Sequence, residues 1–276
     1  MWRLRTRALF MMGLLISALA LAQQNNWKLK FYIEEIPNGY RLLADNEEFA
    51  PMSAAFKFTL NNMKTSLPDG KTVLIPAQTN RFVIGEITAA DRRKSYRFAY
   101  NTTYNIGDVN QMSFDENYIY ELPFEKGKSY RVDQGYNGTF SHQNQNSLDF
   151  RMPEGSKIFA AREGKVVDVV ESNDTHCTTK DCAKFNNKII ILHPDGTFSE
   201  YVHLKLNGAE VNRGGDVAKG QFLGYSGNTG WSNGPHLHFS VFLNRMNGER
   251  LYIPTRFRTA SGSAELLYEK KSYLKN

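Results

Sequence analysis

The chain has 276 residues, of which 41% are hydrophobic, and this is enough apolar material for one large or two modest folded domains. Its formal charge of +6 includes three arginines among the first seven residues. Without those three, 31 basic residues stand against 28 acidic ones, which leaves +3. So weak a positive charge excludes nucleic acid as the implied partner, although it is compatible with an anionic polymer.

The first 22 residues have the pattern of an export signal peptide. A basic start precedes an apolar stretch at residues 8–19, and Ala20-Leu21-Ala22 offers a small-residue cleavage site. The apolar stretch of about twelve residues is shorter than the roughly 20 that cross a bilayer as a helix. We therefore expect cleavage after residue 22 and an exported protein, periplasmic or secreted, with no stable membrane span. An uncleaved membrane anchor is the alternative.

Residues 23–104 alternate apolar and polar side chains with a period of two. Phe56, Phe58 and Leu60, for example, are separated by polar residues, a pattern that indicates half-buried strands. We predict an N-terminal β-sandwich domain here, and no catalytic constellation is evident in it. The strands are separated by turn sequences, at Pro37-Asn38-Gly39, Pro68-Asp69-Gly70 and Ala90-Asp91-Arg92.

Polar residues 105–128, which include Pro123 and Gly127, are predicted to form a linker and the entry strand of a second domain. That domain is placed at 129–250 as an antiparallel β-sheet, followed by a C-terminal strand and tail at 251–276. The fold class predicted for the whole chain is therefore all-β. Its strands are expected at 165–170, 188–192, 197–204, 222–225 and 236–242.

The chain has two cysteines, Cys177 and Cys182, and an exported protein meets an oxidising compartment. We expect them to form a disulfide that closes a short ring and stabilises the fold by about 2 kcal/mol. A second metal site that uses both cysteines and the adjacent His176 is the alternative.

Two histidines lie two residues apart in a strand-like sequence. His236 and His238 should project from one face of the strand, while Leu237 and Phe239 point to the other. Two imidazoles on one face can bind one metal ion together, or one can bind the metal and the other the water on it. Alternatively, they are two ordinary hydrogen-bonded polar residues of a strand.

Three further stretches favour a site. If His142 ends one strand and Asp149 begins the next, the polar loop between them brings imidazole and carboxylate together. His203 is expected on the same strand face as Tyr201, with a buried core histidine as the alternative. Glycine-rich residues 224–235 run directly into the histidine pair, and glycine allows a backbone to approach a ligand closely.

These stretches together resemble the signature blocks of lysostaphin-type (LytM-like) zinc metallopeptidases. The resemblance covers roughly residues 128 to 245, and its most specific block is Gly227 to Phe239. The other blocks are Asp149-Phe150 and Tyr201-Val202-His203-Leu204, and all three occur in the expected order. In this chain six residues separate His142 from Asp149, as in a longer-looped subset of the family. Ser240 stands where an acidic residue is frequent.

The resemblance implies that His142, Asp149 and His238 bind one Zn²⁺ ion and that His203 and His236 are the catalytic histidines. Two neutral imidazoles and a carboxylate leave one coordination position open, as in catalytic zinc sites. Zinc-bound water at that position supplies a nucleophile near neutral pH.

The function implied is a peptidoglycan endopeptidase that cuts peptide cross-links. We expect the glycine-rich stretch and residues 171–187 to border its substrate groove. Tyr225 and Trp231 are candidates for substrate contact, with a packing role as the alternative. A non-catalytic LytM-like regulator of other wall hydrolases is one alternative, and a binding module centred on the N-terminal domain is another. The sequence does not indicate the oligomeric state.

Overall fold

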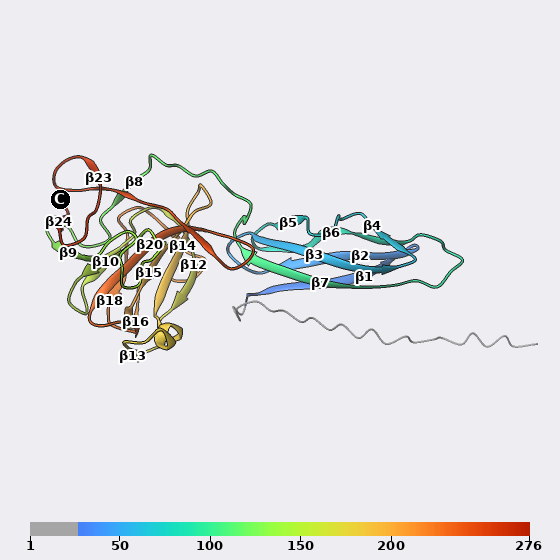
Figure 1. The fold of residues 1–276 in the computed structure, drawn as a ribbon, viewed down its shortest axis with the longest axis horizontal. Coiled ribbons are helices and arrows are strands. Elements are labelled where there is room, and N and C mark those ends of the chain that lie inside the picture. The colour runs from blue at the N-terminus through green and yellow to red at the C-terminus, as the bar shows by residue number, and fades with distance from the viewer. Residues whose placement is uncertain (1–26) are drawn as a thin grey trace, which may run out of the picture.

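The computed structural model describes residues 27–276, so the predicted signal peptide at 1–22 lies outside the described residues. Strands account for 52% of the structure and helix for 2%, which confirms the all-β fold class. In Figure 1, an elongated pair of β-layers projects from a larger, rounded body. We refer to residues 29–106 as the N-terminal layers and to residues 119–274 as the C-terminal body. Among the described residues, no helix has the length and apolarity needed to cross a membrane.

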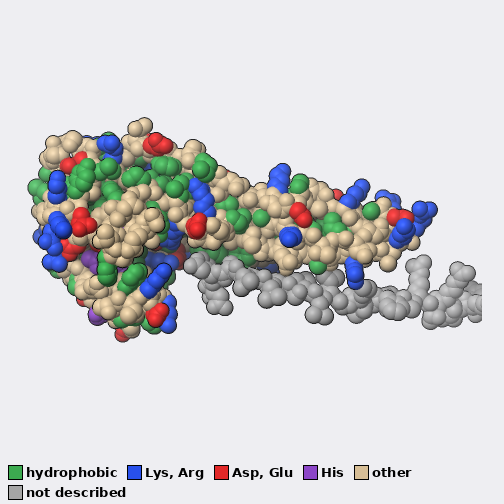
Figure 2. Space-filling model, viewed as in Figure 1, with side chains coloured by type: hydrophobic (Ala, Val, Ile, Leu, Met, Phe, Trp, Pro, Cys, Tyr) green, Lys and Arg blue, Asp and Glu red, His purple; other side chains and the backbone are tan. Residues whose placement is uncertain are grey.

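The N-terminal layers are two antiparallel sheets that share one apolar core. Leu42 from the first sheet packs with Phe56 and Ile75 from the second, as the period-two pattern requires. On the face shown in Figure 2, Lys and Arg side chains of these layers are interspersed with Asp and Glu. The first sheet has the order β1 (Leu29–Ile36), β2 (Gly39–Asn46), β6 (Thr79–Ala89), β4 (Met63–Thr65), and the second β5 (Thr72–Ile75), β3 (Met52–Asn61), β7 (Arg97–Ile106).

The C-terminal body is built on one nine-stranded sheet. The strands predicted at 188–192 and 197–204 form a hairpin in it, since β14 and β15 pair antiparallel from Lys188↔Val202 to Leu192↔Phe198. The sheet order is β17 (Asp216–Val217), β12 (Gly164–Val170), β14 (Lys188–Leu192), β15 (Phe198–Val202), β20 (His236–Asn244), β10 (Ser147–Arg151), β9 (Ser129–Gln134), β24 (Ser272–Leu274), with β21 (Arg250–Tyr252) also paired to β20.

Smaller sheets complete the body, and the main core lies between them and one face of the large sheet. Leu237 and Phe239 of β20 and Leu223 of β18 are among its fully buried residues. The small sheets are β11 (Lys157–Phe159), β18 (Phe222–Ser226), β16 (Leu204–Ala209); then β13 (His176–Cys177), β19 (Gly230–Trp231); then β23 (Ala264–Leu266), β22 (Arg256–Arg258), β8 (Ile119–Glu121). Within residues 27–276 the one helical segment is the 3₁₀ helix η1 (Lys180–Phe185).

The N-terminal layers dock on the opposite face of the large sheet. A third apolar cluster joins Met52 and Ile106 of the layers to Phe198 and Phe242 of the sheet. Polar contacts reinforce it, because the Asn244 side-chain amide donates to the Ile106 carbonyl at 3.2 Å. The layers thus cover part of the same sheet face that carries the candidate site. The domain boundaries after residues 104 and 128 stay predictions.

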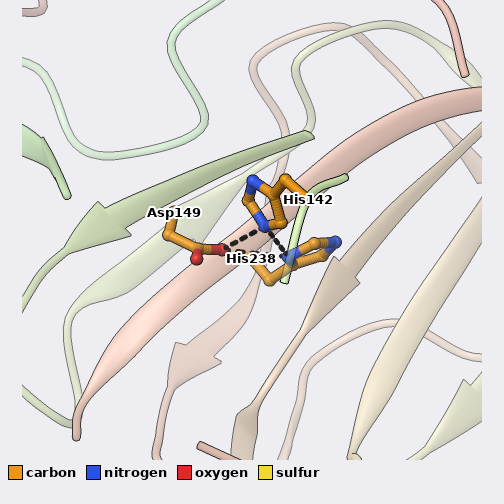
Figure 3. Close-up of side chains that lie close together, drawn as sticks. All are labelled: His142, Asp149 and His238. Carbon is orange, nitrogen blue, oxygen red and sulfur yellow. Dashed lines mark hydrogen bonds and ion pairs between the residues drawn. The ribbon is translucent and has the colours of Figure 1, made fainter. Parts of the chain in front are cut away.

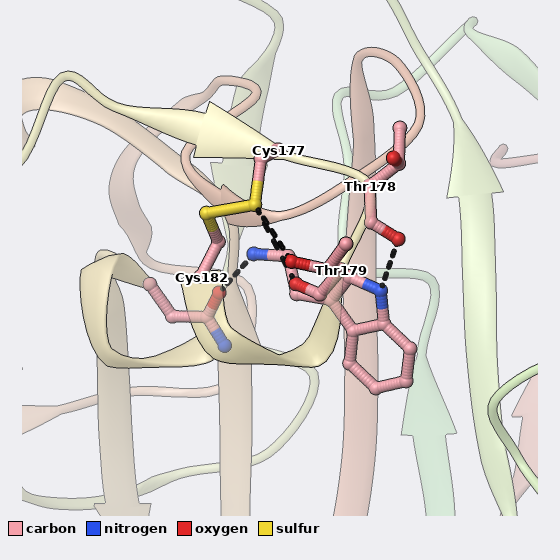
Figure 4. The surroundings of a disulfide bond; sticks show 6 residues. Cys177, Thr178, Thr179 and Cys182 are labelled. Carbon is pink, nitrogen blue, oxygen red and sulfur yellow. Dashed lines mark hydrogen bonds between the residues drawn. A yellow bond between two sulfur atoms is a disulfide. The ribbon is translucent and has the colours of Figure 1, made fainter.

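The two cysteines form the expected disulfide. It links the end of β13 to η1, with Thr178 and Thr179 in the short ring between them (Figure 4). Because each sulfur is bonded to the other, neither is free to ligate a metal, and the alternative of a second metal site with His176 is wrong. The described part of the chain contains one gathered group of three potential ligands, at His142, Asp149 and His238.

Candidate metal centre

Adjacent strands place two of the expected ligands side by side. Strand β10 pairs with β20 so that Asp149 lies directly opposite His238. Their neighbours Phe150 and Leu237 point into the main core, which turns the carboxylate and the imidazole to the other, open face. The period-two pattern of the sequence therefore positions these two groups correctly, and His236 projects from the same face as predicted.

His142 reaches the same point from a loop. The prediction that it ends a strand is wrong, because β9 ends at Gln134 and β10 begins at Ser147. The intervening loop folds back on itself, with Asn137 and Asn144 in left-handed conformations that a short polar side chain tolerates. This brings the His142 imidazole, which is 1% exposed, beside the Asp149 carboxylate.

The spacing of the three side chains fits a zinc ion. Their candidate ligand atoms all lie within 4.8 Å of one another, and the three side chains converge in Figure 3. His142 Nε2 lies 3.3 Å from both His238 Nδ1 and Asp149 Oδ1, and the last two atoms are 2.9 Å apart. Tetrahedral zinc with bonds of about 2.0–2.1 Å separates its ligand atoms by about 3.3 Å. The donor set and its spacing therefore match a tetrahedral site with one position open.

Backbone carbonyls fix which nitrogen each histidine presents. Nδ1 of His142 donates to the Gly135 carbonyl at 3.0 Å, Nδ1 of His203 to Thr229 at 2.7 Å, and Nδ1 of His236 to Gly234 at 2.8 Å. A carbonyl accepts only from a protonated nitrogen, so in each ring the Nε2 lone pair is free. All three rings lie along the same groove. His238 is the exception, since its Nδ1 faces Asp149.

His203 lies in the groove, but Tyr201 does not share its face. Tyr201 is fully buried in the main core, where its hydroxyl accepts from the Ala161 amide at 2.8 Å. Strand β15 ends at Val202, and His203 adopts a left-handed conformation with φ of 65°. Such a conformation is uncommon for a residue with a Cβ atom and reverses the direction of its side chain. The predicted shared face is therefore wrong, although His203 reaches the groove.

His203 and His236 form a pair beside the three ligands. Their ring centroids are 4.4 Å apart, and His236 Nε2 lies 3.8 Å from Asp149 Oδ1. Burial, aided by the nearby imidazoles of His236 and His238, lowers the pKa of His203 to about 3. His203 is therefore neutral at physiological pH, and its Nε2 lone pair is unprotonated.

Asp149 is held ionised and oriented. Burial acts to raise its pKa, but the imidazoles of His142 and His238 beside the carboxylate outweigh burial and hold the pKa well below 3.8. The Gln134 side-chain amide donates to Asp149 Oδ2 at 3.0 Å, which leaves Oδ1 for the metal. The same amide donates to Ser141 Oγ, and its carbonyl accepts from the backbone of Phe140 and Ser141. Gln134 thus organises both the carboxylate and the loop of His142.

The centre lies in a groove of about 1540 Å³. One wall includes Phe140, 61% exposed, and Trp231, whose ring centroids are 6.3 Å apart. The disulfide ring supports this wall, because the Trp231 indole N–H donates to the Thr178 carbonyl at 3.1 Å. Both predicted border segments therefore contribute, the glycine-rich stretch and residues 171–187. Tyr225 is not among the groove residues and instead packs on Phe222.

Sequence patterns missed three residues that support the centre. Gln134 sits in a strand with no motif around it, and Glu200 and Arg250 are 50 residues apart yet joined by a hydrogen bond of 2.8 Å. Only Glu200 carried a detectable signal, because a charged residue within the apolar stretch of a predicted strand needs a buried partner.

Comparison with known proteins places this geometry in a family context. The model of Peptidase family M23 matches residues 143–251, starting one residue after His142. An uncharacterized metalloprotease of Buchnera aphidicola subsp. Baizongia pistaciae (strain Bp) is 26% identical over 238 residues, which are 80% of this chain and 60% of that protein. Peptidoglycan DD-endopeptidase ShyA of Vibrio cholerae serotype O1 is 33% identical over 111 residues, or 40% of this chain and 23% of ShyA.

Among solved structures, the catalytic domain of the antimicrobial peptidase lysostaphin from Staphylococcus simulans is 28% identical. The structural match covers 45% of this chain and 87% of that domain, with a TM-score of 0.33. The chain spans 60% or less of the length of the two curated relatives described above.

Proposed function

Residues 143–251 belong to Peptidase family M23, and on this premise we propose that the chain is an exported zinc endopeptidase that hydrolyses the peptide cross-links of peptidoglycan. ShyA, which is 33% identical to this chain over 111 residues, is named a peptidoglycan DD-endopeptidase. The proposal of export comes from the sequence pattern of residues 1–22.

One observation carries the proposal. Five polar side chains converge on one point of the groove, three with zinc-like spacing and two with free Nε2 lone pairs beside them. Three protein ligands and an open position are the arrangement of catalytic zinc sites, whereas structural sites have four ligands. The centre also opens onto the groove of about 1540 Å³, which is large enough to admit a peptide.

The residues divide the chemistry between them. Zinc bound by His142, Asp149 and His238 would supply a Lewis acid that polarises a carbonyl and lowers the pKa of a bound water to about 7. His203 and His236 present their Nε2 atoms within the groove, where they orient water, accept its proton and donate to the developing oxyanion. The lowered pKa of His203 keeps its Nε2 unprotonated at neutral pH, so that it can accept a hydrogen bond from water.

Digestion of purified sacculi tests the proposal. The full mature chain, loaded with one equivalent of zinc, should release muropeptides whose masses show a broken peptide cross-link and intact glycan. His238→Ala should bind less zinc and release none. His176→Ala is the matched control, because His176 is exposed and outside the groove, and it should behave as wild type.

A non-catalytic regulator gives a different result. Wild type that carries no zinc and releases no muropeptide, yet increases release by another wall hydrolase, would replace the proposed activity with regulation.

A further inference from the structure

Each of the four groove histidines has one ring nitrogen turned toward the centre and one turned away from it. The histidines differ in the group that the second nitrogen faces. In His142, His203 and His236 that nitrogen is Nδ1, and it donates to a backbone carbonyl at 3.0 Å or less. His238 is turned the other way, with Nδ1 toward the centre and Nε2 away from it. Metal binding through Nδ1 requires the ring proton on Nε2. The partner of this N–H therefore decides how well His238 serves as a ligand.

The group that faces Nε2 of His238 is a buried carboxylate. Glu200 Oε1 lies 3.9 Å from it, and the Glu200 side chain is 8% exposed. Glu200 lies on β15 directly opposite Ser240 of β20, two residues from His238 on the same strand face. Cross-strand pairing thus brings a carboxylate beside the ligand from a strand that contributes no metal ligand itself.

The Glu200 carboxylate is itself held in place. Ser240 Oγ and Arg250 Nη1 each donate to Oε1 at 2.8 Å. The Arg250 guanidinium is fixed in turn, because it stacks on the Phe242 ring with 3.8 Å between Cζ and the ring centroid. A carboxylate with two donors and little exposure costs free energy to bury and needs a compensating role.

We propose that Glu200 is a positioning residue that fixes the tautomer and orientation of His238 and strengthens it as a zinc ligand. This inference rests on the zinc centre of the proposed function. A carboxylate that faces the Nε2–H of a ligand histidine makes the opposite nitrogen a better donor, and loss of such a partner weakens metal binding about 10- to 100-fold.

A pair of variants separates this role from a merely structural one. Glu200→Gln keeps the shape but removes the charge, and it should lower zinc affinity about 10- to 100-fold in competition with a chromogenic chelator. Arg250→Gln frees the carboxylate from its cation, so affinity should be unchanged or higher. If both variants lose affinity together, or if Glu200→Gln binds zinc as wild type does, the proposal is overturned.

A swapped variant gives a second measurement. Glu200→Ser with Ser240→Glu moves the carboxylate onto β20 at the opposite position of the same face, with little change in total side-chain volume. It should bind zinc more tightly than Glu200→Ser alone, and equal affinities would contradict the proposal. Thermal melts of the zinc-free proteins establish that each variant is folded. This readout is independent of hydrolysis, so wild type that binds zinc but cleaves no sacculi would refute the proposed function and leave the role of Glu200 standing.

Discussion

The metal centre and the polar cluster around His193 use the same kinds of side chain in the same body. His193 is also buried, and its Nδ1 also donates to a backbone carbonyl, that of Glu163, at 2.6 Å. Burial lowers the pKa of His193 to about 4, as it lowers the pKa of His203 to about 3. A neutral, oriented, buried histidine is therefore common to both places and does not by itself indicate a catalytic site.

The two places differ in what stands next to the carboxylate. In the His193 cluster Asp195 bonds Arg162 Nη1 at 2.8 Å and Thr197 Oγ1 at 2.7 Å, so a fixed cation already neutralises it. In the metal centre Asp149 Oδ1 faces imidazoles and the groove, while Oδ2 accepts from the Gln134 amide. Among the described residues the His193 Nε2 has no hydrogen-bond partner, whereas the free lone pairs of the centre converge. A metal site needs several acceptor atoms that converge on one point and that no protein cation already neutralises.

The largest expected effect is on catalysis. His203→Ala and His236→Ala should each lower the rate of sacculus digestion about 10²- to 10⁴-fold, because proton transfer and oxyanion stabilisation are lost. Zinc content, measured by plasma mass spectrometry, should stay at one ion per chain. His193→Gln is the control and should digest at the wild-type rate. Loss of zinc from the His203 or His236 variant would show that the assignment of ligands is incomplete.

Arg162→Met tests the other member of the comparison, the His193 cluster. Arg162 is 4% exposed and stacks on the Tyr118 ring with its Cζ 3.9 Å from the centroid, so its removal leaves Asp195 without its cation. The free energy of unfolding in urea should fall by about 3 to 5 kcal/mol, with zinc content and digestion rate unchanged. Arg41→Met, which breaks the exposed pair with Glu86, should cost less than about 1 kcal/mol. Equal losses of unfolding free energy in the two variants would show that the buried ion pair of the His193 cluster stabilises the fold no more than an exposed ion pair does.

The sequence predicted the strands and most of the centre because local periodicity determines both. A period of two places Asp149, His236 and His238 on the open face, and the glycine-rich stretch marks the approach. The alternation could not predict the sheet face on which His203 lies. That face depends on the left-handed backbone conformation of His203 itself, which sequence alternation does not encode.

Supporting residues were out of reach for a different reason. Strand pairing alone brings Gln134 and Glu200 close to the proposed ligands. Pairing partners that are separated by tens of residues are not visible in local sequence patterns. The docking of Met52 and Ile106 on the large sheet is equally nonlocal.

The pH dependence of stability tests whether His193 is structural. Its pKa is about 4 when folded and about 6.5 when unfolded, so the unfolded chain binds the proton more tightly between these values. Its contribution is therefore fully present above pH 6.5 and is lost as pH falls toward 4. Between pH 7.5 and pH 5, wild type should lose about 2 kcal/mol more unfolding free energy in urea than His193→Gln does. Parallel pH profiles for the two proteins would contradict the lowered pKa.

The smallest expected effect comes from the disulfide, which supports one wall of the groove and touches neither cluster. Cys177→Ser with Cys182→Ser opens a short ring, so the unfolding free energy should fall by no more than about 2 kcal/mol. Thr178 should then hold the Trp231 indole less firmly, which weakens substrate binding but leaves the ligands in place. KM for a soluble cross-linked muropeptide should rise severalfold while kcat and zinc content stay unchanged. A fall in kcat with unchanged KM would instead place the ring in contact with the catalytic histidines, against the separation of wall and centre described above.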